Sequence, residues 1–204
     1  MDKSIEISKG VTIEDYELLC DNKNKAEIAE MVYNRFYDRY LKPFSFANDD
    51  FKKNYKNGFS MMASACLLIE TYMAFQYGAK STKGKGKKYF KNFFNEEPEF
   101  EIFKDISTNN GKNTIPYKFY YNIRCGIMHQ GETNEGWTIT RKKDSPLFDK
   151  TTFQINAHKF QKELDNVLLR YKNELQTKDW TDEIWINLVR KMDYVIKNCK
   201  KVEL

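Results

Sequence analysis

The chain has 204 residues, of which 41% are hydrophobic and 15% aromatic, with nine Gly and four Pro. This composition excludes a disordered or collagen-like chain, because there is enough apolar surface to offset the entropy lost on folding. The length predicts a single domain over residues 1–204. The net charge of +5 is small in a chain with 31% charged residues, so charge alone indicates no particular partner.

The first residues are polar and of mixed charge, without the apolar stretch of a secretory leader, so we expect a cytoplasmic protein. The four cysteines contain no C-x-x-C pair, which argues against a zinc site and against a disulfide framework. We therefore expect reduced thiols, no metal and no cofactor. The cysteines are Cys20, Cys66, Cys125 and Cys199.

The N-terminal half of the chain predicts a loose arm over residues 1–22, with a short helix at 12–20 that Thr12 can cap. Helical spacing of apolar residues predicts a long amphipathic helix over 25–41, ended by Pro43. The segment 60–78 is apolar on nearly every side, which is typical of a helix at the centre of a bundle. Polar residues interrupt it, so we do not expect a membrane span.

A lysine-rich segment, residues 80–88, comes next and precedes a short aromatic helix around 89–94. It lacks the G-x-x-x-x-G-K-[ST] pattern of a phosphate-binding P-loop. Two interpretations are open: a solvated linker, or a mobile segment that attracts the phosphates of a polyanion. In the second interpretation the substrate-binding residues are Lys83, Lys85, Lys87 and Lys88.

The C-terminal half predicts a helix from about 115 to 131, with Thr114 as its cap. Strand-forming residues at 137–140 and 152–155 indicate a β-hairpin inserted over 137–156. Two helices follow, at 157–175 and 179–199. The predicted class is therefore mainly all-α, an up-and-down bundle of four to five long helices with an inserted β-hairpin.

Acid–base chemistry at neutral pH points to histidine, and the chain has two. His158 begins a helix in an ordinary amphipathic setting and is interpreted as structural or exposed. His129 lies five residues after Arg124, in R-C-G-I-M-H-Q-G-E-T at the end of a helix. On a straight α-helix the two side chains are about 140° apart and roughly 7.5 Å apart along the axis. Either the helix frays at His129, or the pair lines a groove with a neighbouring helix or a second copy of the chain.

Two further residues distinguish this segment. Gly126 in a helix interior costs about 1 kcal/mol relative to Ala, which is tolerable where another backbone approaches closely. Glu70 carries a negative charge within the most apolar helix and requires a cationic partner if it is buried. Arg124 is the candidate partner; the alternatives are a surface lysine or solvent.

The R-x4-H pattern at a helix end, preceded by Tyr120-Tyr121-Asn122-Ile123 in a helical chain of this size, resembles the HEPN superfamily. The resemblance covers about residues 25–199 and is most specific at the ten residues of the motif. Many members are metal-independent ribonucleases of toxin–antitoxin, phage-defence and RNA-guided systems. The resemblance implies a homodimer, RNA as substrate, and an antitoxin or nucleotidyltransferase as partner.

By this resemblance Arg124 and His129 are the catalytic residues of an endoribonuclease that leaves 2′,3′-cyclic phosphate ends. The position after the arginine, polar in many active members, is Cys125 here. A non-catalytic HEPN-like dimer that binds RNA, nucleotide or protein is therefore the alternative. Asn122 and Gln130 flank the motif and can bind substrate or cap the helix. Trp137 and the tyrosines can stack on bases or belong to the core.

Overall fold

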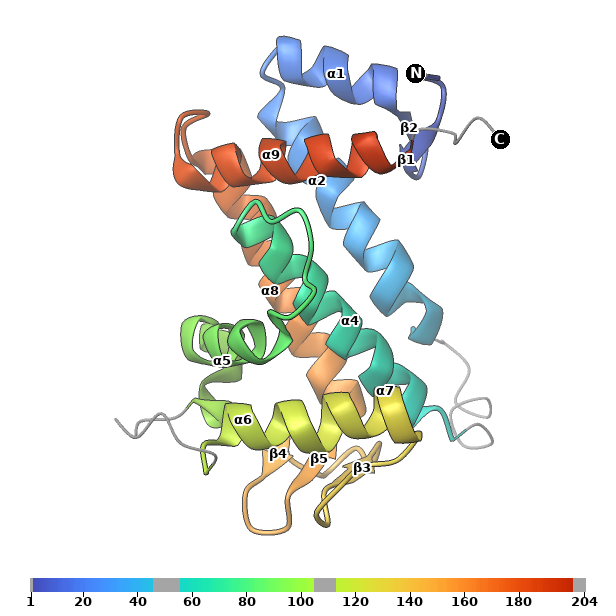
Figure 1. Cartoon of the computed structure of the whole chain (residues 1–204), viewed down its shortest axis with the longest axis vertical. Coiled ribbons are helices and arrows are strands. Elements are labelled where there is room, and N and C mark those ends of the chain that lie inside the picture. Colours follow the sequence, from blue (N-terminus) through green and yellow to red (C-terminus); the bar gives the residue numbers. More distant parts are fainter. Residues whose placement is uncertain (1, 46–55, 105–112, 200–204) are drawn as a thin grey trace. The chain divides into compact units, whose positions relative to one another are not determined.

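Most of the residues described by the computed structural model, 2–45, 56–104 and 113–199, are helical (Figure 1). The predicted mainly α-helical class is confirmed. Backbone contacts divide the chain, which we predicted to be one domain, into two units. Unit 1 comprises Met1–Arg39, Thr71–Thr82 and Leu168–Leu204, and unit 2 comprises Tyr40–Glu70 and Lys83–Val167.

Unit 1 contains a two-stranded antiparallel hairpin and helices from both ends of the chain (Figure 1). Trp185, Phe36 and Phe75 are fully buried in its core: Trp185 donates from Nε1 to the carbonyl of Leu175 at 3.0 Å, and Phe36 packs edge-on against Phe75. Its elements are β1 (Glu6–Ser8), β2 (Val11–Thr12), α1 (Ile13–Asp21), α2 (Lys25–Phe36), α9 (Glu183–Asn198) and the last parts of α4 (Gly58–Gln76) and α8 (Ala157–Thr177).

The N-terminal segment is ordered, and the expectation of a loose arm over residues 1–22 is wrong. The hairpin and α1 bury Ile7, Ile13 and Tyr16. The predicted helix and its cap are confirmed, since Thr12 and Asp15 form a reciprocal capping box. The missed signal is the alternation of β1, which is too short to stand out by its sequence pattern.

Unit 2 is built on a cluster of phenylalanine rings with no exposed surface. Phe94 packs against Phe103 and Phe119 with ring centroids 4.8 Å away in each case. Such rings each bury about 150–250 Å² and dominate the energy of a core. The elements are the first parts of α4 and α8 with α5 (Gly86–Glu96), η3 (Pro98–Phe103), α6 (Ile115–Phe119), η4 (Tyr120–Cys125), α7 (Gly126–Gln130), β3 (Thr138–Thr140), β4 (Phe148–Asp149) and β5 (Gln154–Asn156).

The strands of unit 2 differ from the predicted hairpin. β3 pairs with β5 in parallel, and β4 pairs with β5 on its other side in an antiparallel arrangement. Parallel pairing needs a connection long enough to return the chain to the same end of the sheet, and residues 141–153 supply it. The predicted hairpin implied antiparallel pairing of the two strands at 137–140 and 152–155, which is wrong, and β4 was not predicted.

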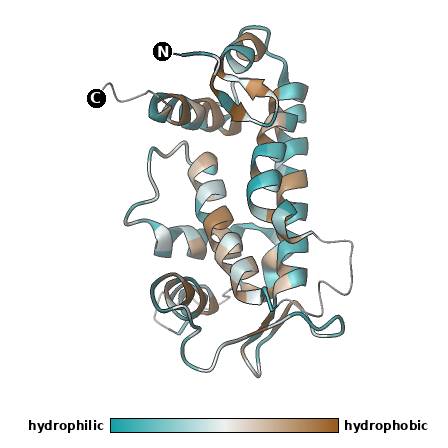
Figure 2. Cartoon of the chain, turned by 90° about the vertical axis from the view of Figure 1, so that its right-hand side faces the viewer, coloured by the Kyte–Doolittle hydropathy of each residue, from teal (hydrophilic) through white to brown (hydrophobic). Residues whose placement is uncertain are grey.

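Helix α2 continues beyond Phe36 as a π-helical turn, η1 (Tyr37–Leu41), and a 3-10 turn, η2 (Lys42–Phe44), which contains Pro43. The predicted helices at 157–175 and 179–199 correspond to α8 and α9, although α9 begins only at Glu183. In Figure 2 hydrophobic residues are concentrated on the helices, whereas the connecting loops are mostly hydrophilic.

Helix α4 is long and apolar enough to cross a membrane by length and composition. However, 67% of its most apolar window is buried within the structure. A helix at the centre of a packed protein passes the same test, so this finding does not distinguish a span from a core helix.

The four cysteines are free thiols. Burial raises the pKa of the Cys66 thiol on α4 far above its ordinary value, although the nearby Arg124 acts in the opposite direction. Within residues 2–45, 56–104 and 113–199, no group of three His, Cys, Asp or Glu side chains is arranged to hold a metal ion.

Candidate functional site

Residues 115–130 form one continuous helical rod in which the π-helical turn η4 separates α6 from α7 (Figure 1). As predicted, Thr114 caps its start, where its hydroxyl accepts a hydrogen bond from the amide of Tyr117. Gly131 ends it in the left-handed conformation, with φ of 73°, and donates to the carbonyl of Ile127. The π turn was not predicted; it ends at Cys125, directly after Arg124.

Arg124 and His129 meet within one chain. Arg124 Nη1 lies 3.3 Å from His129 Nε2. The two alternatives expected from the sequence, fraying at His129 or a groove with a neighbouring element, are therefore not needed for the contact, since both residues lie on one helical rod, Arg124 near the end of η4 and His129 in α7. No fraying at His129 is needed, since α7 continues to Gln130.

Glu70 pairs with Arg124, which was the candidate partner, and not with a surface lysine or with solvent alone. Its Oε1 accepts from Arg124 Nε at 2.7 Å, and the Glu70 and Arg124 side chains are 11% and 20% exposed. Burial by itself lowers the pKa of the guanidinium, but the hydrogen bond and charge attraction of Glu70 outweigh it and leave the pKa above the ordinary value. Arg124 is therefore positively charged and is held in place by the buried Glu70, while His129 is exposed.

Gly126 permits a close approach of the backbone, which confirms the prediction. A Cβ at this position would lie 2.4 Å from the carbonyl oxygen of Glu132 and 3.2 Å from Asn134 Nδ2. The segment after Gly131 therefore folds back onto the start of α7. The backbone N–H of Asn134 donates a hydrogen bond to the backbone carbonyl of Asn122, and this bond holds the turn beside the motif.

We expect Gly126→Ala to destabilise the protein by about 1–3 kcal/mol, because the methyl group displaces a packed backbone segment. Helix propensity alone predicts the opposite sign, a gain of about 1 kcal/mol. Urea unfolding of the variant and the wild type distinguishes the two. A more stable variant would show that the turn after Gly131 does not contact α7.

The lysine-rich segment approaches the same site. Gly86, the first residue of α5, is so close to Tyr120 that a Cβ would lie 2.9 Å from its ring, and 3.4 Å from Glu70 Oε1. Lys85 and Lys87 flank this glycine, and Lys87 Nζ lies 4.5 Å from the centre of the Tyr117 ring. The predicted substrate-binding residues Lys83, Lys85, Lys87 and Lys88 are all exposed.

Only some of the residues predicted to support Arg124 and His129 lie beside that pair. Asn122 is buried and donates to Glu135 Oε2 at 3.0 Å, so it stabilises the turn and does not face the arginine. Cys125 lies beside Tyr120, whose pKa is raised mainly by burial and further by that thiol. Gln130 is exposed at the last position of α7.

The other candidates, Trp137 and His158, are buried and half-buried in the packed protein. Trp137 is 3% exposed and stacks on Phe148 and Phe153, which places it in the core. His158 is the second residue of α8 and is half-buried. Tyr120, whose ring centre lies 5.8 Å from Arg124 Cζ, belongs to the site and was not among the predicted site residues.

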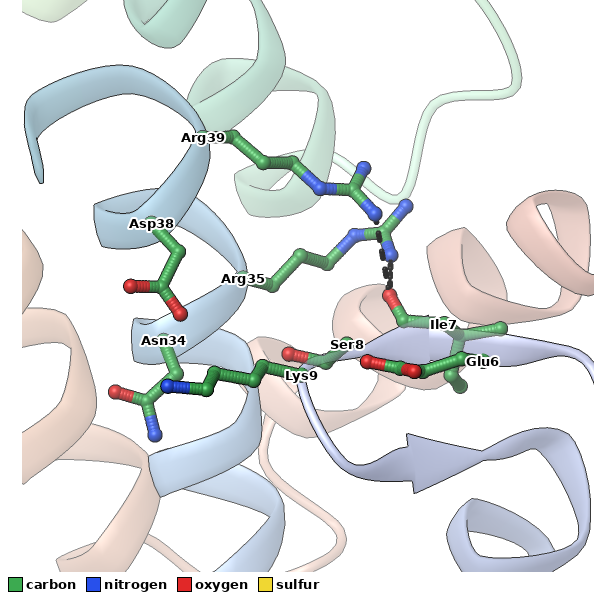
Figure 3. A pocket seen from close by; sticks show the side chains of 8 residues that line it. All are labelled: Glu6, Ile7, Ser8, Lys9, Asn34, Arg35, Asp38 and Arg39. Atoms are coloured by element: carbon green, nitrogen blue, oxygen red, sulfur yellow. Dashed lines mark hydrogen bonds between the residues drawn. The ribbon is translucent and has the colours of Figure 1, made fainter. Parts of the chain in front are cut away.

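Unit 1 contains two surface cavities that the sequence analysis did not single out. One, of about 240 Å³, is lined by residues of β1 and α2 (Figure 3). There Arg35 and Arg39 extend side by side and both donate to the carbonyl of Ile7, which ties the hairpin to α2. Glu6, Lys9 and Asp38 give the lining both signs of charge, so it does not select an anion.

The second cavity, of about 420 Å³, lies between α1 and α9. Burial raises the pKa of Cys20 in its wall, so the thiol is a weak nucleophile. Asp193 and Lys197 also line it, again with both signs of charge. The arginine and histidine of unit 2 are thus the stronger candidates for chemistry.

No family model, curated protein or solved structure matches this chain. Function is therefore inferred from the side chains themselves.

Proposed function

We propose that the chain is a HEPN-like, metal-independent endoribonuclease with Arg124 and His129 as its catalytic residues. The observation that carries the proposal is the 3.3 Å separation of Arg124 Nη1 and His129 Nε2, with Glu70 holding Nε of the same guanidinium. A fixed cation beside an exposed imidazole is the pair of groups that phosphodiester transesterification requires.

The reaction uses the ribose as its own nucleophile. Nε2 of a neutral His129 accepts the proton of the 2′-hydroxyl, and the 2′-oxygen forms a bond to phosphorus. The bond from phosphorus to the 5′-oxygen breaks, and that oxygen takes up a proton from an imidazolium or from water. The products carry a 2′,3′-cyclic phosphate and a 5′-hydroxyl, and the protons balance.

Arg124 stabilises the negative charge that develops on the phosphate oxygens. Within the described residues its guanidinium uses Nε for Glu70 and Nη1 for His129, which leaves Nη2 to meet a phosphate oxygen. When RNA binds, the guanidinium turns from the imidazole to the phosphate, and Nε2 becomes available to the 2′-hydroxyl. The exposed lysines of residues 83–88 add attraction for the RNA backbone.

The HEPN-like bundle is part of the same proposal, and so is a homodimer in which two Arg–His pairs approach each other and the second His129 supplies the acid. A setting in defence or toxin–antitoxin systems, an antitoxin or nucleotidyltransferase partner and a cytoplasmic location stay predictions. The oligomeric state is measured directly by sedimentation of the purified protein.

We expect the purified protein to cleave a single-stranded RNA of generic sequence in the presence of EDTA. The fragments should carry 2′,3′-cyclic phosphates, detected by mass spectrometry as ends that lack one water relative to a monophosphate. A DNA strand of the same sequence should remain intact, because it has no 2′-hydroxyl. Intact RNA at high protein concentration would contradict the proposal.

A non-catalytic protein that binds RNA through the same residues is the second candidate. The position of Cys125 favours it, because a thiol is a weaker hydrogen-bond partner than the amides or carboxylates expected after the arginine. Retention of RNA without cleavage, lost on replacement of Arg124, is the result expected for this candidate.

A further inference from the structure

A row of tyrosine rings leads along the helical rod to the Arg–His pair. Tyr117 and Tyr121 have ring centroids 4.4 Å apart, at an interplanar angle of 36°. Tyr121 in turn lies 5.2 Å from Tyr120, edge to face, and Tyr120 lies beneath the guanidinium of Arg124. We call Tyr117, Tyr120 and Tyr121 the tyrosine stripe.

The outer end of this stripe is accessible. Tyr121 is 40% exposed, and Tyr117 is half-buried. Phe119, between them in sequence, has no exposed surface and belongs to the phenylalanine core. Tyr117 and Tyr121 therefore lie at the edge of this core, where part of their ring surface is accessible.

The stripe also carries positive charge at both ends. Lys87 lies over the face of Tyr117 at one end, and Arg124 over Tyr120 at the other. The close approach of Gly86 to Tyr120 brings Lys85 and Lys87 to this edge of the site. Cations beside accessible aromatic rings are the features with which proteins bind single-stranded nucleic acid, through phosphates and stacked bases.

We propose that Tyr117 and Tyr121 are a stacking platform for bases of single-stranded RNA that lie a few nucleotides from the phosphate held by Arg124 and His129. This inference rests on the proposed function of that pair. Tyr121 precedes His129 by eight residues, or about 12 Å of helix. At about 3.4 Å for each stacked nucleotide, the base on Tyr121 is roughly three or four positions from the cleaved bond. The substrate is thus an unpaired segment of several nucleotides, since a base in a duplex cannot reach a ring.

The test measures binding of a non-cleavable, fully 2′-O-methylated RNA 12-mer by fluorescence anisotropy. We expect Tyr121→Ala to weaken binding by about tenfold or more, and Tyr121→Phe to retain it, because stacking needs the ring and not the hydroxyl. Binding of a duplex of the same sequence should not change between the variants. Equal loss for single strand and duplex would overturn the platform.

Unit 1 supplies a matched control. Tyr33 and Tyr37 also stack, with centroids 5.6 Å apart, and Lys172 lies over Tyr33 as Lys87 lies over Tyr117. Tyr33→Ala removes a similar ring pair on another helix and should leave RNA affinity unchanged. An equal loss in Tyr33→Ala would mean that the effect of Tyr121→Ala reflects general destabilisation.

The length of the RNA separates stacking from other roles of Tyr121. A dinucleotide reaches the Arg–His pair but not the platform, so Tyr121→Ala should bind it as the wild type does, while the difference appears with oligomers of about five nucleotides or more. A loss independent of length would overturn the inference.

If the wild type cleaves RNA and Tyr121→Ala binds the 12-mer normally, the inference fails while the nuclease stands. If nothing is cleaved but the length-dependent loss is seen, the nuclease fails and the platform stands.

Discussion

Replacing His129 with Ala should lower the rate of RNA cleavage by about 100- to 10,000-fold, the contribution of a positioned general acid or base. The imidazole is exposed, so its removal leaves no buried group without a partner and should not affect folding. The measurement is the initial rate on a fluorescent single-stranded RNA, with unfolding in urea as a check on stability.

His158→Ala is the matched control, because it removes the only other histidine of the chain. We expect it to keep the wild-type rate.

Arg124→Ala should lower the rate of RNA cleavage by about 100- to 1,000-fold, as expected for a group that stabilises charge in the transition state. Arg124→Lys keeps the charge but not the planar fork that reaches Glu70 and His129 together, so most of the loss should remain. Cleavage at the wild-type rate by His129→Ala would place the activity elsewhere.

The second large effect is expected at Glu70, which positions Arg124 and does not touch the substrate. Glu70→Gln keeps an oxygen that can accept from Nε but removes the charge that compensates the guanidinium. We expect the free energy of unfolding to fall by about 1–3 kcal/mol. The rate at saturating RNA should fall by about ten- to a hundredfold, because a small misplacement of a catalytic group is costly.

Glu174→Gln is the control for this variant. Glu174 forms a partly exposed i, i+4 pair with Arg170 at 2.9 Å, and pairs at the surface contribute about 1 kcal/mol or less. Rates are compared at a temperature where every variant is folded. A Glu70→Gln protein that loses stability but keeps the wild-type rate at saturation would make Glu70 a structural residue only.

Local patterns in the sequence predicted the long helices and their ends. The capping residues bind backbone groups within one turn of their own positions, so their roles follow from neighbouring residues. They are Thr12, Thr114 and Gly131. The cost of a glycine inside a helix is local as well, and it correctly predicted that a backbone segment packs against Gly126.

The tertiary structure decided what lies far apart in sequence or depends on an irregular backbone. Glu70 and Arg124 are 54 residues apart, and composition could only nominate them as partners. The direction of β3 relative to β5 depends on the path of a loop. The two units interleave in sequence, because α4 and α8 each contribute to both, so no linker marks a boundary.

The sequence by itself determined a helical protein in which an arginine and a histidine come at the end of one helix. Whether those side chains meet was decided by the tertiary structure, in which Glu70 on α4 binds Nε of Arg124 while Nη1 lies 3.3 Å from Nε2 of His129. The physical reason is that periodicity reports which face of a helix is buried, whereas the position of a long polar side chain depends on the partners that it contacts in three dimensions.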